Sequence, residues 1–257
     1  MAGGTREPGS GVLERAGRIL SAFSDREPAL SVSGIASRTG LPRSTVHRIA
    51  SELVAVGYLR RGTDGYEIGT RLFEIGVLAA PVRRLAEAAA AAMRHLSDLV
   101  GGATVRLHVL SDEDPARAAA LLVQRLPGSG GASDRPRVGG RSSLVATSEG
   151  RALLIGQDDA WLYAFARRSG AVTGDDGALD PAELRLTVAG DRERGHSIAA
   201  NPDTPDRLTL AVPIRRAADL PQAALGVDVL NHESARRALP VLRATGQTIR
   251  EAVTASS

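Results

Sequence analysis

The stretch GLPRSTVHRIASELVAVGYLRR, residues 40–61, indicates the fold of the first part of the chain. If residues 43–55 form a helix with about 100° between successive residues, the apolar side chains gather on one side. These are Val46, Ile49, Ala50 and Leu53. The opposite side carries hydrogen-bond donors, most of them in the first half of the helix: Arg43, Ser44, His47, Arg48 and Ser51. Helices that read base edges in DNA do so with their N-terminal residues, so this pattern is typical of a recognition helix.

The flanking residues predict the elements that accompany such a helix. We expect Ser10 to cap a helix that begins near residue 12, and Ser31 to cap a short helix over 32–39 that ends at Gly40. Residues 24–29 are expected to form a polar loop. After the quoted stretch, Thr63-Asp64-Gly65 joins two short alternating runs, and the Asp-Gly pair between them predicts a β-hairpin. The order of helices and hairpin predicts a winged helix-turn-helix that binds double-stranded DNA.

Charge supports this prediction. Residues 38–61 hold five arginines against one glutamate, a net charge of +4 that exceeds the +3 of the whole chain. Every one of the 32 basic residues is arginine, which codon usage in a G+C-rich genome also explains, and an arginine-rich helix face can simply be solvated. Arginine presents planar forks that suit guanine and phosphate. The candidate DNA-contacting residues are Arg43, Ser44, Thr45, His47, Arg48, Ser51, Arg60 and Arg61.

Composition limits the other possibilities. The 257 residues are 43% hydrophobic, enough for two small domains with their own cores. There is no cysteine, so disulfides and thiolate chemistry are excluded. No apolar run approaches the roughly 20 residues of a membrane span, and the N-terminus lacks the apolar core of a signal peptide. We therefore expect a cytoplasmic protein.

Beyond residue 100, strand-like and helix-like segments follow in mixed order. Strands are expected at 103–110, 118–126, 195–200, 208–214 and 224–230, and helices at 146–156, 158–168, from Pro181 after an Asp180 cap, and at 233–253. Residues 127–142 read as a loop. The order fits an antiparallel sheet covered by helices, so the predicted fold class is α+β. The expected divisions are a flexible tail (1–9), a winged helix-turn-helix domain (10–69), a linker helix (70–82) and a second domain (83–257).

Residues 12–76 resemble the N-terminal domain of the IclR family of bacterial transcriptional regulators. The resemblance is carried by VLERAGRIL, IASRTGLPRSTVHRIASELVAVGYLRR and GYEIGTRLFEIG. The chain departs from the family at Gly34, where the family has Glu. The second half resembles the family's GAF-like effector-binding domain through ATSEGRALL, RERGHS and LAVPI, although Val145 and Arg151 replace the family's His and Lys.

The resemblance implies a regulator, repressor or activator, that binds operator DNA as a homodimer or a dimer of dimers, with the linker helix helping to pair the subunits. It also implies that a small-molecule effector modulates the protein, and it implies no metal or cofactor. In family members that bind small organic acids, backbone amides and side chains hold the carboxylate. The corresponding positions here are Ser148, Glu149, Thr209, Gly226 and Asp228.

Several of these positions differ chemically from the family pattern. Thr209 stands where the family has Cys, and Gly226 and Asp228 stand where it has Ser. A second carboxylate about 4 Å from Asp228 would be repelled by on the order of 4 kcal/mol at an effective dielectric constant of 20. Unless Arg141 or Arg151 compensates, small acids should bind poorly, and the site would take a neutral or cationic metabolite or be vestigial. The alternative is that Asp228 points to solvent.

Two other classes of function are open to such a chain, an enzyme and a protein-interaction adaptor with an incidental winged helix. The histidines of the second half are scattered without metal-ligand spacing. The glycine-rich segment 128–140 lacks Gly-Lys-Ser/Thr, and no Gly-x-Ser-x-Gly elbow is present. We expect a protein that is not an enzyme.

Overall fold

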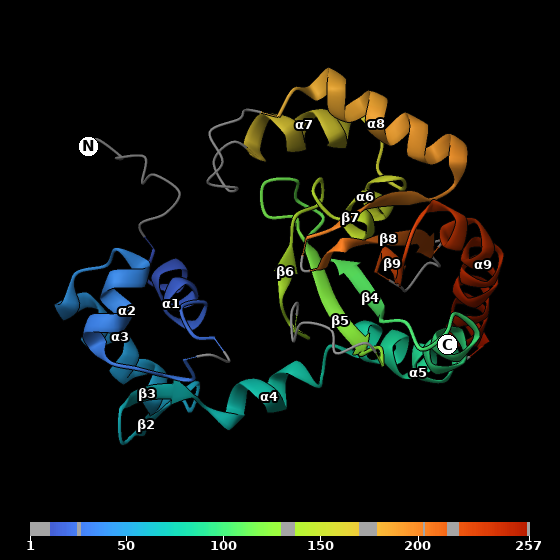
Figure 1. Ribbon diagram of the computed structural model, residues 1–257. Helices are drawn as coiled ribbons and strands as arrows, with labels where there is room; N and C mark the ends of the chain where they lie inside the picture. The colour runs from blue at the N-terminus through green and yellow to red at the C-terminus, as the bar shows by residue number, and fades with distance from the viewer. Residues whose placement is uncertain are drawn as a thin grey trace. The chain divides into compact units, whose positions relative to one another are not determined.

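The computed structural model of the chain describes residues 11–24, 27–129, 137–169, 179–202, 204–214 and 221–255. The chain divides into two compact units, one up to Ala79 and one from Ala80 onwards (Figure 1). The first unit is mainly helical, whereas the second is a sheet with helices on both faces. The predicted α+β class is confirmed. None of the described helices is both long enough and apolar enough to cross a membrane.

The first unit follows the order predicted from residues 40–61. Its elements are α1 (Val12–Leu20), β1 (Ala29–Leu30), α2 (Val32–Thr39), α3 (Arg43–Ala55), β2 (Leu59–Gly62), β3 (Gly65–Ile68) and α4 (Thr70–Gly76). All four apolar residues predicted for the inner face of α3 are buried, in a core shared with Ile19 of α1 and Ile35 of α2. That burial fixes the rotation of α3 about its axis.

Local signals set the ends of these elements. Ser31 caps α2 by accepting a hydrogen bond from the Gly34 backbone N–H at 3.1 Å. Gly40 ends α2 with φ of 67°, a left-handed conformation that favours glycine. Ser10 lies outside the described residues, and Gly11 is the N-cap of α1.

The sheet of the first unit has one strand that was not predicted. Ala29 and Leu30 pair with Glu67 and Tyr66 of β3, so the hairpin becomes a three-stranded sheet of order β1-β3-β2. The prediction of a loop through residue 29 was wrong at its last residue, because Leu30 is buried in the core and its backbone completes the sheet.

The second unit is a six-stranded antiparallel sheet of order β6-β5-β4-β9-β8-β7. Its strands are β4 (Val105–Leu110), β5 (Ala120–Leu126), β6 (Arg141–Ser142), β7 (Ser197–Asn201), β8 (Thr204–Ile214) and β9 (Ala223–Val229). Its helices are α5 (Ala80–Leu99), α6 (Ser148–Leu154), α7 (Asp159–Ser169), α8 (Pro181–Arg194) and α9 (His232–Ala255). Asp180 caps α8 as predicted, accepting from the Ala182 N–H at 2.9 Å. The short strand β6 replaces the end of the predicted loop, because Arg141 and Ser142 pair with β5.

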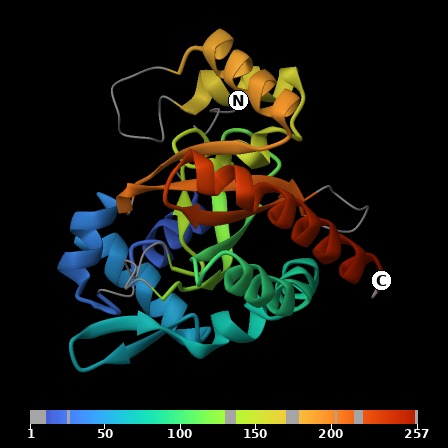
Figure 2. The ribbon, with the colours of Figure 1, turned by 45° about the vertical axis from the view of Figure 1, so that its right-hand side comes forward.

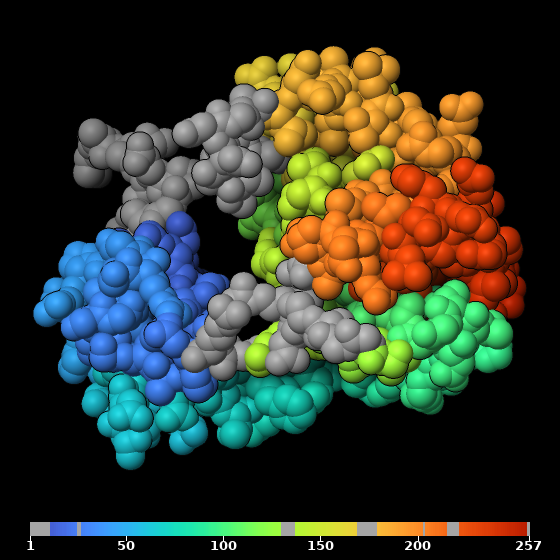
Figure 3. Space-filling view, viewed as in Figure 1, coloured from blue at the N-terminus to red at the C-terminus, as the bar shows by residue number. Residues whose placement is uncertain are grey.

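The helices form a layer on each side of this sheet. Figure 2 shows α9 and α5 on one face and α6, α7 and α8 on the other. At the surface, α9 lies beside α5 (Figure 3). Side chains alternate along a strand, so Val105, Leu107 and Val109 of β4 enter the core under α5 and α9. Arg106 and His108 therefore face α6, and that face of the sheet carries the polar residues described below.

Candidate functional site

The outer face of α3 presents donors to solvent. Arg43, Ser44, His47 and Arg48 are exposed, while Thr45 and Ser51 are partly exposed. Because Val46 and its apolar neighbours are anchored in the core, the polar face cannot turn inward. The N-terminal half of α3 thus combines a free surface with side chains that can hydrogen-bond to base edges or phosphates.

The hairpin β2–β3 brings two more arginines beside α3. The Arg61 guanidinium lies over the Tyr66 ring, 5.3 Å from its centroid, and Nη2 donates to Ser51 Oγ of α3 at 3.5 Å. Arg60 forms an ion pair with Glu67 on the neighbouring strand. The exposed positions of both side chains suit contacts with a phosphate backbone. The structure therefore brings together Ser51 and Arg61, two residues predicted to contact DNA.

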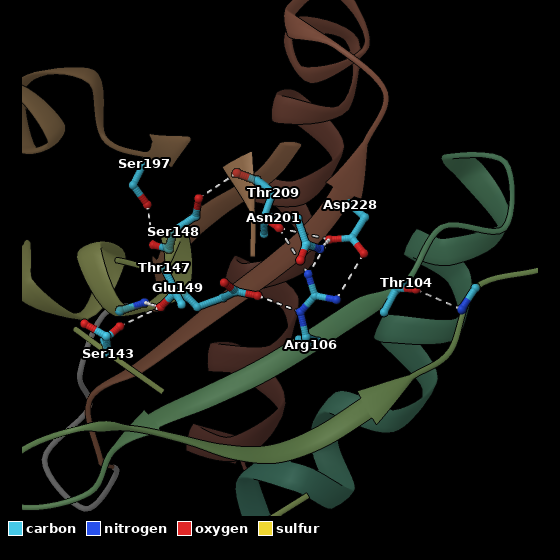
Figure 4. Close-up of polar contacts among 12 residues, drawn as sticks. Thr104, Arg106, Ser143, Thr147, Ser148, Glu149, Ser197, Asn201, Thr209 and Asp228 are labelled. Carbon is cyan, nitrogen blue, oxygen red and sulfur yellow. Dashed lines mark hydrogen bonds and ion pairs between the residues drawn. The ribbon is translucent and has the colours of Figure 1, made fainter. Parts of the chain in front are cut away.

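Within the second unit, the positions inferred for effector binding lie close together where α6 begins above the sheet. Figure 4 shows four of them, Ser148, Glu149, Thr209 and Asp228, and the fifth, Gly226, packs against the Glu149 side chain. Thr209 of β8 and Asp228 of β9 lie directly opposite each other in the sheet. Ser148 and Glu149 are the first residues of α6, whose N-cap Thr147 accepts from the Gly150 N–H at 3.1 Å. All four of these site residues are buried.

The structure adds one residue that sequence reasoning missed, Arg106 of β4, which lies opposite Gly226 of β9. Arg106 is only 5% exposed. Its Nε donates to Glu149 Oε1 at 2.8 Å, and its Nη1 donates to Asp228 Oδ2 at 3.1 Å. Nη2 donates to Thr209 Oγ1 at 3.1 Å and also contacts Asp228 Oδ1. One guanidinium thus connects two carboxylates and a hydroxyl; we call these four residues the Arg106 cluster.

Further hydrogen bonds fix the members of the cluster. Asp228 Oδ1 accepts from Asn201 Nδ2 at 2.9 Å and from Thr209 Oγ1 at 3.0 Å. Ser148 Oγ donates to the Thr209 carbonyl at 2.7 Å, and Ser197 Oγ donates to the Ser148 carbonyl at 2.5 Å. The start of α6 is therefore tied to β7 and β8, which holds Glu149 in place above the sheet.

Arg141 and Arg151, the two arginines considered as possible compensation for Asp228, are engaged elsewhere. Arg151 forms a bidentate pair with Asp191 of α8, with distances of 2.8 and 2.7 Å. Arg141 is exposed and contacts the Arg117 carbonyl. The compensating charge comes from Arg106 instead, and Asp228 points into the cluster rather than to solvent.

The cluster carries one positive and two negative charges. Burial acts to raise the pKa of Glu149, but the charge and hydrogen bond of Arg106 outweigh it, so this pKa is lowered from its ordinary value. Burial acts to lower the pKa of Arg106, but Glu149 and Asp228 raise it overall, so the guanidinium stays protonated. Burial lowers the pKa of His108, which keeps the adjacent imidazole neutral at pH 7. The net charge of the cluster is therefore −1.

The cavity that borders Arg106, Glu149 and Thr209 is small. A cavity of about 40 Å³ is lined by Arg106, His108, Ser142, Thr147, Ser148, Glu149, Ala200, Asn201, Pro202 and Thr209. Pockets for organic ligands usually measure roughly 300–1,000 Å³. His108 is 2% exposed, and its Nδ1 has no hydrogen-bond partner among the described residues. Across those same residues, no group of three or more His, Asp or Glu side chains is arranged to hold a metal ion.

Arg106 could have been found from its sequence context. In VRLHVL, residues 105–110, Arg106 and His108 alternate with apolar residues, so both must face the same side of the strand. Charged residues are rarely buried without a partner. A search for the counter-charge of Asp228 should therefore have included the strands and not only the arginines nearest the α6 motif.

Comparisons with known proteins agree with this geometry. Residues 12–62 match the family model described as the IclR helix-turn-helix domain, and residues 78–253 match the bacterial transcriptional regulator IclR C-terminal model. The Pca regulon regulatory protein of Pseudomonas putida is 27% identical, over 92% of this chain and 82% of its own. The transcriptional repressor IclR of Escherichia coli is 24% identical, over 72% and 67%.

A solved structure is also similar over the full chain. The crystal structure of an IclR homologue from Microbacterium hydrocarbonoxydans complexed with 4-hydroxybenzoate has a TM-score of 0.77 and 28% identity. The alignment covers 95% of this chain and 100% of that one. Both units thus have counterparts in one known architecture.

Proposed function

Because the chain belongs to the IclR family of bacterial transcriptional regulators, we propose that it binds an operator as a dimer, inside the cytoplasm and without catalysing a reaction. Its first domain is a DNA-binding helix-turn-helix and its second is an effector-binding domain. The proposal goes further by assigning residues. Arg43, Ser44, Thr45, His47, Arg48 and Ser51 contact the major groove, and Arg60 and Arg61 contact phosphates or the minor groove from the wing.

The observation that carries the DNA-binding assignment is the exposed donor face of α3. Four donors of the N-terminal half point outward because the apolar face is buried. Arg48 is already extended along the helix by its pair with Glu52, at 2.7 Å. Both features restrict the motion of these donors before DNA binds, which lowers the entropic cost of binding.

Dimerisation is supported by the apolar surface of α4 and of the turn after it. Phe73 is 75% exposed and Leu78 is 77% exposed, and Ile75 and Val77 are also exposed. Several large apolar side chains exposed within six residues of chain are typical of an interaction site. We assign this patch to a second copy of the chain, because a two-fold dimer places one recognition helix on each half-site of an operator.

For the effector, we assign Ser148, Glu149, Thr209, Gly226 and Asp228 to the binding site, with Arg106 added. The Microbacterium relative was crystallised with 4-hydroxybenzoate, which is an aromatic carboxylate. In this chain, the site that we assign already contains two carboxylates, Glu149 and Asp228. We propose that this chain does not take small acids as its effector.

The test is direct capture of DNA by the purified chain. Genomic fragments retained by the protein are sequenced, and the recovered site is titrated against a scrambled fragment of equal length. We expect binding to the recovered site at least about 10³-fold tighter than to the scrambled one. Equal affinity for both fragments would contradict the assignment, and turnover of a metabolite would support an enzyme instead.

A further inference from the structure

We infer that Glu149 is an internal carboxylate ligand of Arg106, and that this pair closes the effector site to small external acids. The inference rests on the proposed function, because it concerns the site assigned there to the effector. It makes Arg106 and Glu149 the residues that determine ligand specificity.

The first argument is that residues of the chain itself already accept most of the hydrogen bonds that the Arg106 guanidinium can donate. Arg106 employs Nε toward Glu149 and both terminal nitrogens toward Asp228, with Thr209 as a further acceptor. Charge-assisted hydrogen bonds of this kind are the strong ones, and bidentate geometry adds specificity. Four of the five N–H groups of the guanidinium are thus directed at Glu149, Asp228 and Thr209. An external carboxylate could therefore form a bidentate pair with Arg106 only by displacing at least one of these bonds.

The second argument is space. If residue 226 carried a Cβ, that atom would lie 2.6 Å from Glu149 Cγ and 2.6 Å from Oε1. The Glu149 side chain therefore occupies the space above β9 that a side chain at position 226 would need. With Glu149 in this position, the cavity that borders Arg106, Glu149 and Thr209 measures about 40 Å³. A separate hollow of about 450 Å³ is lined by Asp228 but by none of these three residues.

The third argument is the hydrogen bonding of Glu149 itself. Its carboxylate accepts the Arg106 Nε–H at 2.8 Å, and this ion pair acts to lower its pKa. The carboxylate thus already has the cationic donor that an organic acid would require. The Glu149 carboxylate therefore already occupies the position on Arg106 that an external acid would need.

These observations define a sharp chemical test. Replacing Glu149 by Ala keeps Cβ and removes one CH₂ group and the carboxylate, which together correspond to acetate. The remaining Arg106–Asp228 pair has no net charge, and a bound acetate would restore the present charge of −1. Acetate is therefore the predicted replacement for the missing group, while neutral acetamide has the same shape but cannot restore the charge.

The experiment titrates acetate and acetamide into the full chain by calorimetry and by thermal melting. We expect Glu149→Ala to bind acetate on the order of tenfold or more tighter than the unmodified chain does, and to prefer acetate over acetamide by a similar factor. Glu149→Gln retains the volume and should gain no acetate binding. The double variant Arg106→Met with Glu149→Ala should lose the gain.

Two results would overturn the inference. One is a folded Glu149→Ala variant that does not bind acetate, or whose binding survives loss of Arg106. The other result concerns the unmodified chain. If it binds acetate, pyruvate or benzoate saturably, and Arg106→Met abolishes that binding, the site is open to acids.

Operator binding separates this inference from the proposed function. Fluorescence anisotropy with the captured DNA is measured for Glu149→Ala with and without acetate. Acetate binding that changes operator affinity supports both the inference and the effector role of the site. Acetate binding with unchanged operator affinity supports the inference and contradicts the effector role, whereas absence of acetate binding overturns the inference whatever the DNA result.

Discussion

Glu149 and Gly226 share one volume: a Cβ on residue 226 would approach Glu149 Cγ and Oε1 to 2.6 Å. The glycine leaves room for the Glu149 side chain beside β9, where its carboxylate accepts a hydrogen bond from Arg106 of the neighbouring strand. The two positions are therefore linked sterically, although 77 positions separate them in the chain.

The first prediction concerns this steric link. Gly226→Ala should destabilise the unmodified chain by about 1–3 kcal/mol, because Glu149 must leave its place beside Arg106. The same change should cost less in the Glu149→Ala background, since the space is then free. Urea denaturation of the four proteins of this double-mutant cycle gives the coupling, expected at about 0.5–3 kcal/mol. Additive effects would show that Glu149 does not fill that space.

The second prediction concerns pH. Because the pKa of His108 is lowered by burial, the unfolded chain takes up a proton below the ordinary pKa of 6.5 while the folded chain does not. Stability should therefore fall as the pH drops from 7 through 6.5, with a slope of up to about 1.4 kcal/mol per pH unit from this one group. Arg106 and Glu149 are the charged groups that face it.

His108→Gln should reduce that slope, whereas the exposed His232→Gln is the matched control. At lower pH the depressed pKa of Glu149 adds a second loss of stability, because its stabilisation is complete above its ordinary pKa of 4.5 and disappears as the folded group is protonated. Denaturation curves measured from pH 8 down to about pH 2 cover both losses. If the dependence of stability on pH near 6.5 is unchanged in His108→Gln, His108 is not the group responsible for it.

The third prediction concerns base recognition by α3. Arg43→Ala or Arg48→Ala should each weaken operator binding by about 1–3 kcal/mol if the arginine that is replaced binds guanine. Binding to scrambled DNA should change less. The exposed Arg185→Ala, on α8, provides a control with the same change in charge. Unchanged operator affinity in both α3 variants would remove the recognition-helix assignment.

The fourth prediction concerns the wing. Arg60→Ala combined with Arg61→Ala should weaken binding to all sequences and should lower the salt slope by about 0.9 for each phosphate that the variant no longer neutralises. Titrations at several salt concentrations measure the slope, and Arg83→Ala serves as a control outside the first unit. A double variant that loses discrimination between sites but keeps the slope would show that the wing reads bases.

The fifth prediction concerns subunit pairing. Phe73→Glu combined with Leu78→Glu should weaken the dimer, because two charges would be buried at an apolar interface. Leu186→Glu is the matched control, since Leu186 is a similarly exposed apolar residue on α8. Multi-angle light scattering gives the mass of each protein. An unmodified chain that is monomeric both alone and on DNA would contradict the dimer.

Elements specified by neighbouring residues could be predicted from the sequence. The inner face of α3, the Ser31 cap and the Gly40 end of α2 depend on spacings of a few residues, and all agree with the structure. The hairpin turn at Thr63-Asp64 is equally local. Each of these signals involves only a few neighbouring residues, so it can be recognised without knowledge of the tertiary structure.

The Arg106 cluster depends instead on contacts between residues that are far apart in the sequence. Arg106 meets Glu149, Thr209 and Asp228, which lie 43, 103 and 122 positions further along the chain. The sequence leaves open whether an arginine compensates the charge of Asp228, and sheet order and register decide that Arg106 does so. The strands β1 and β6 escaped prediction for a related reason, because two-residue strands have no periodicity and exist only through their partners.

A hydroxyl-radical footprint on the captured operator tests the central claim, that paired recognition helices of a dimer read this DNA. The account predicts two protected half-sites whose centres lie about 34–36 Å apart, or a multiple of that distance, along the duplex. Protection should disappear from both half-sites together in Arg43→Ala combined with Arg48→Ala. A single protected patch, or a footprint that this double variant reproduces at the same protein concentration, would contradict it.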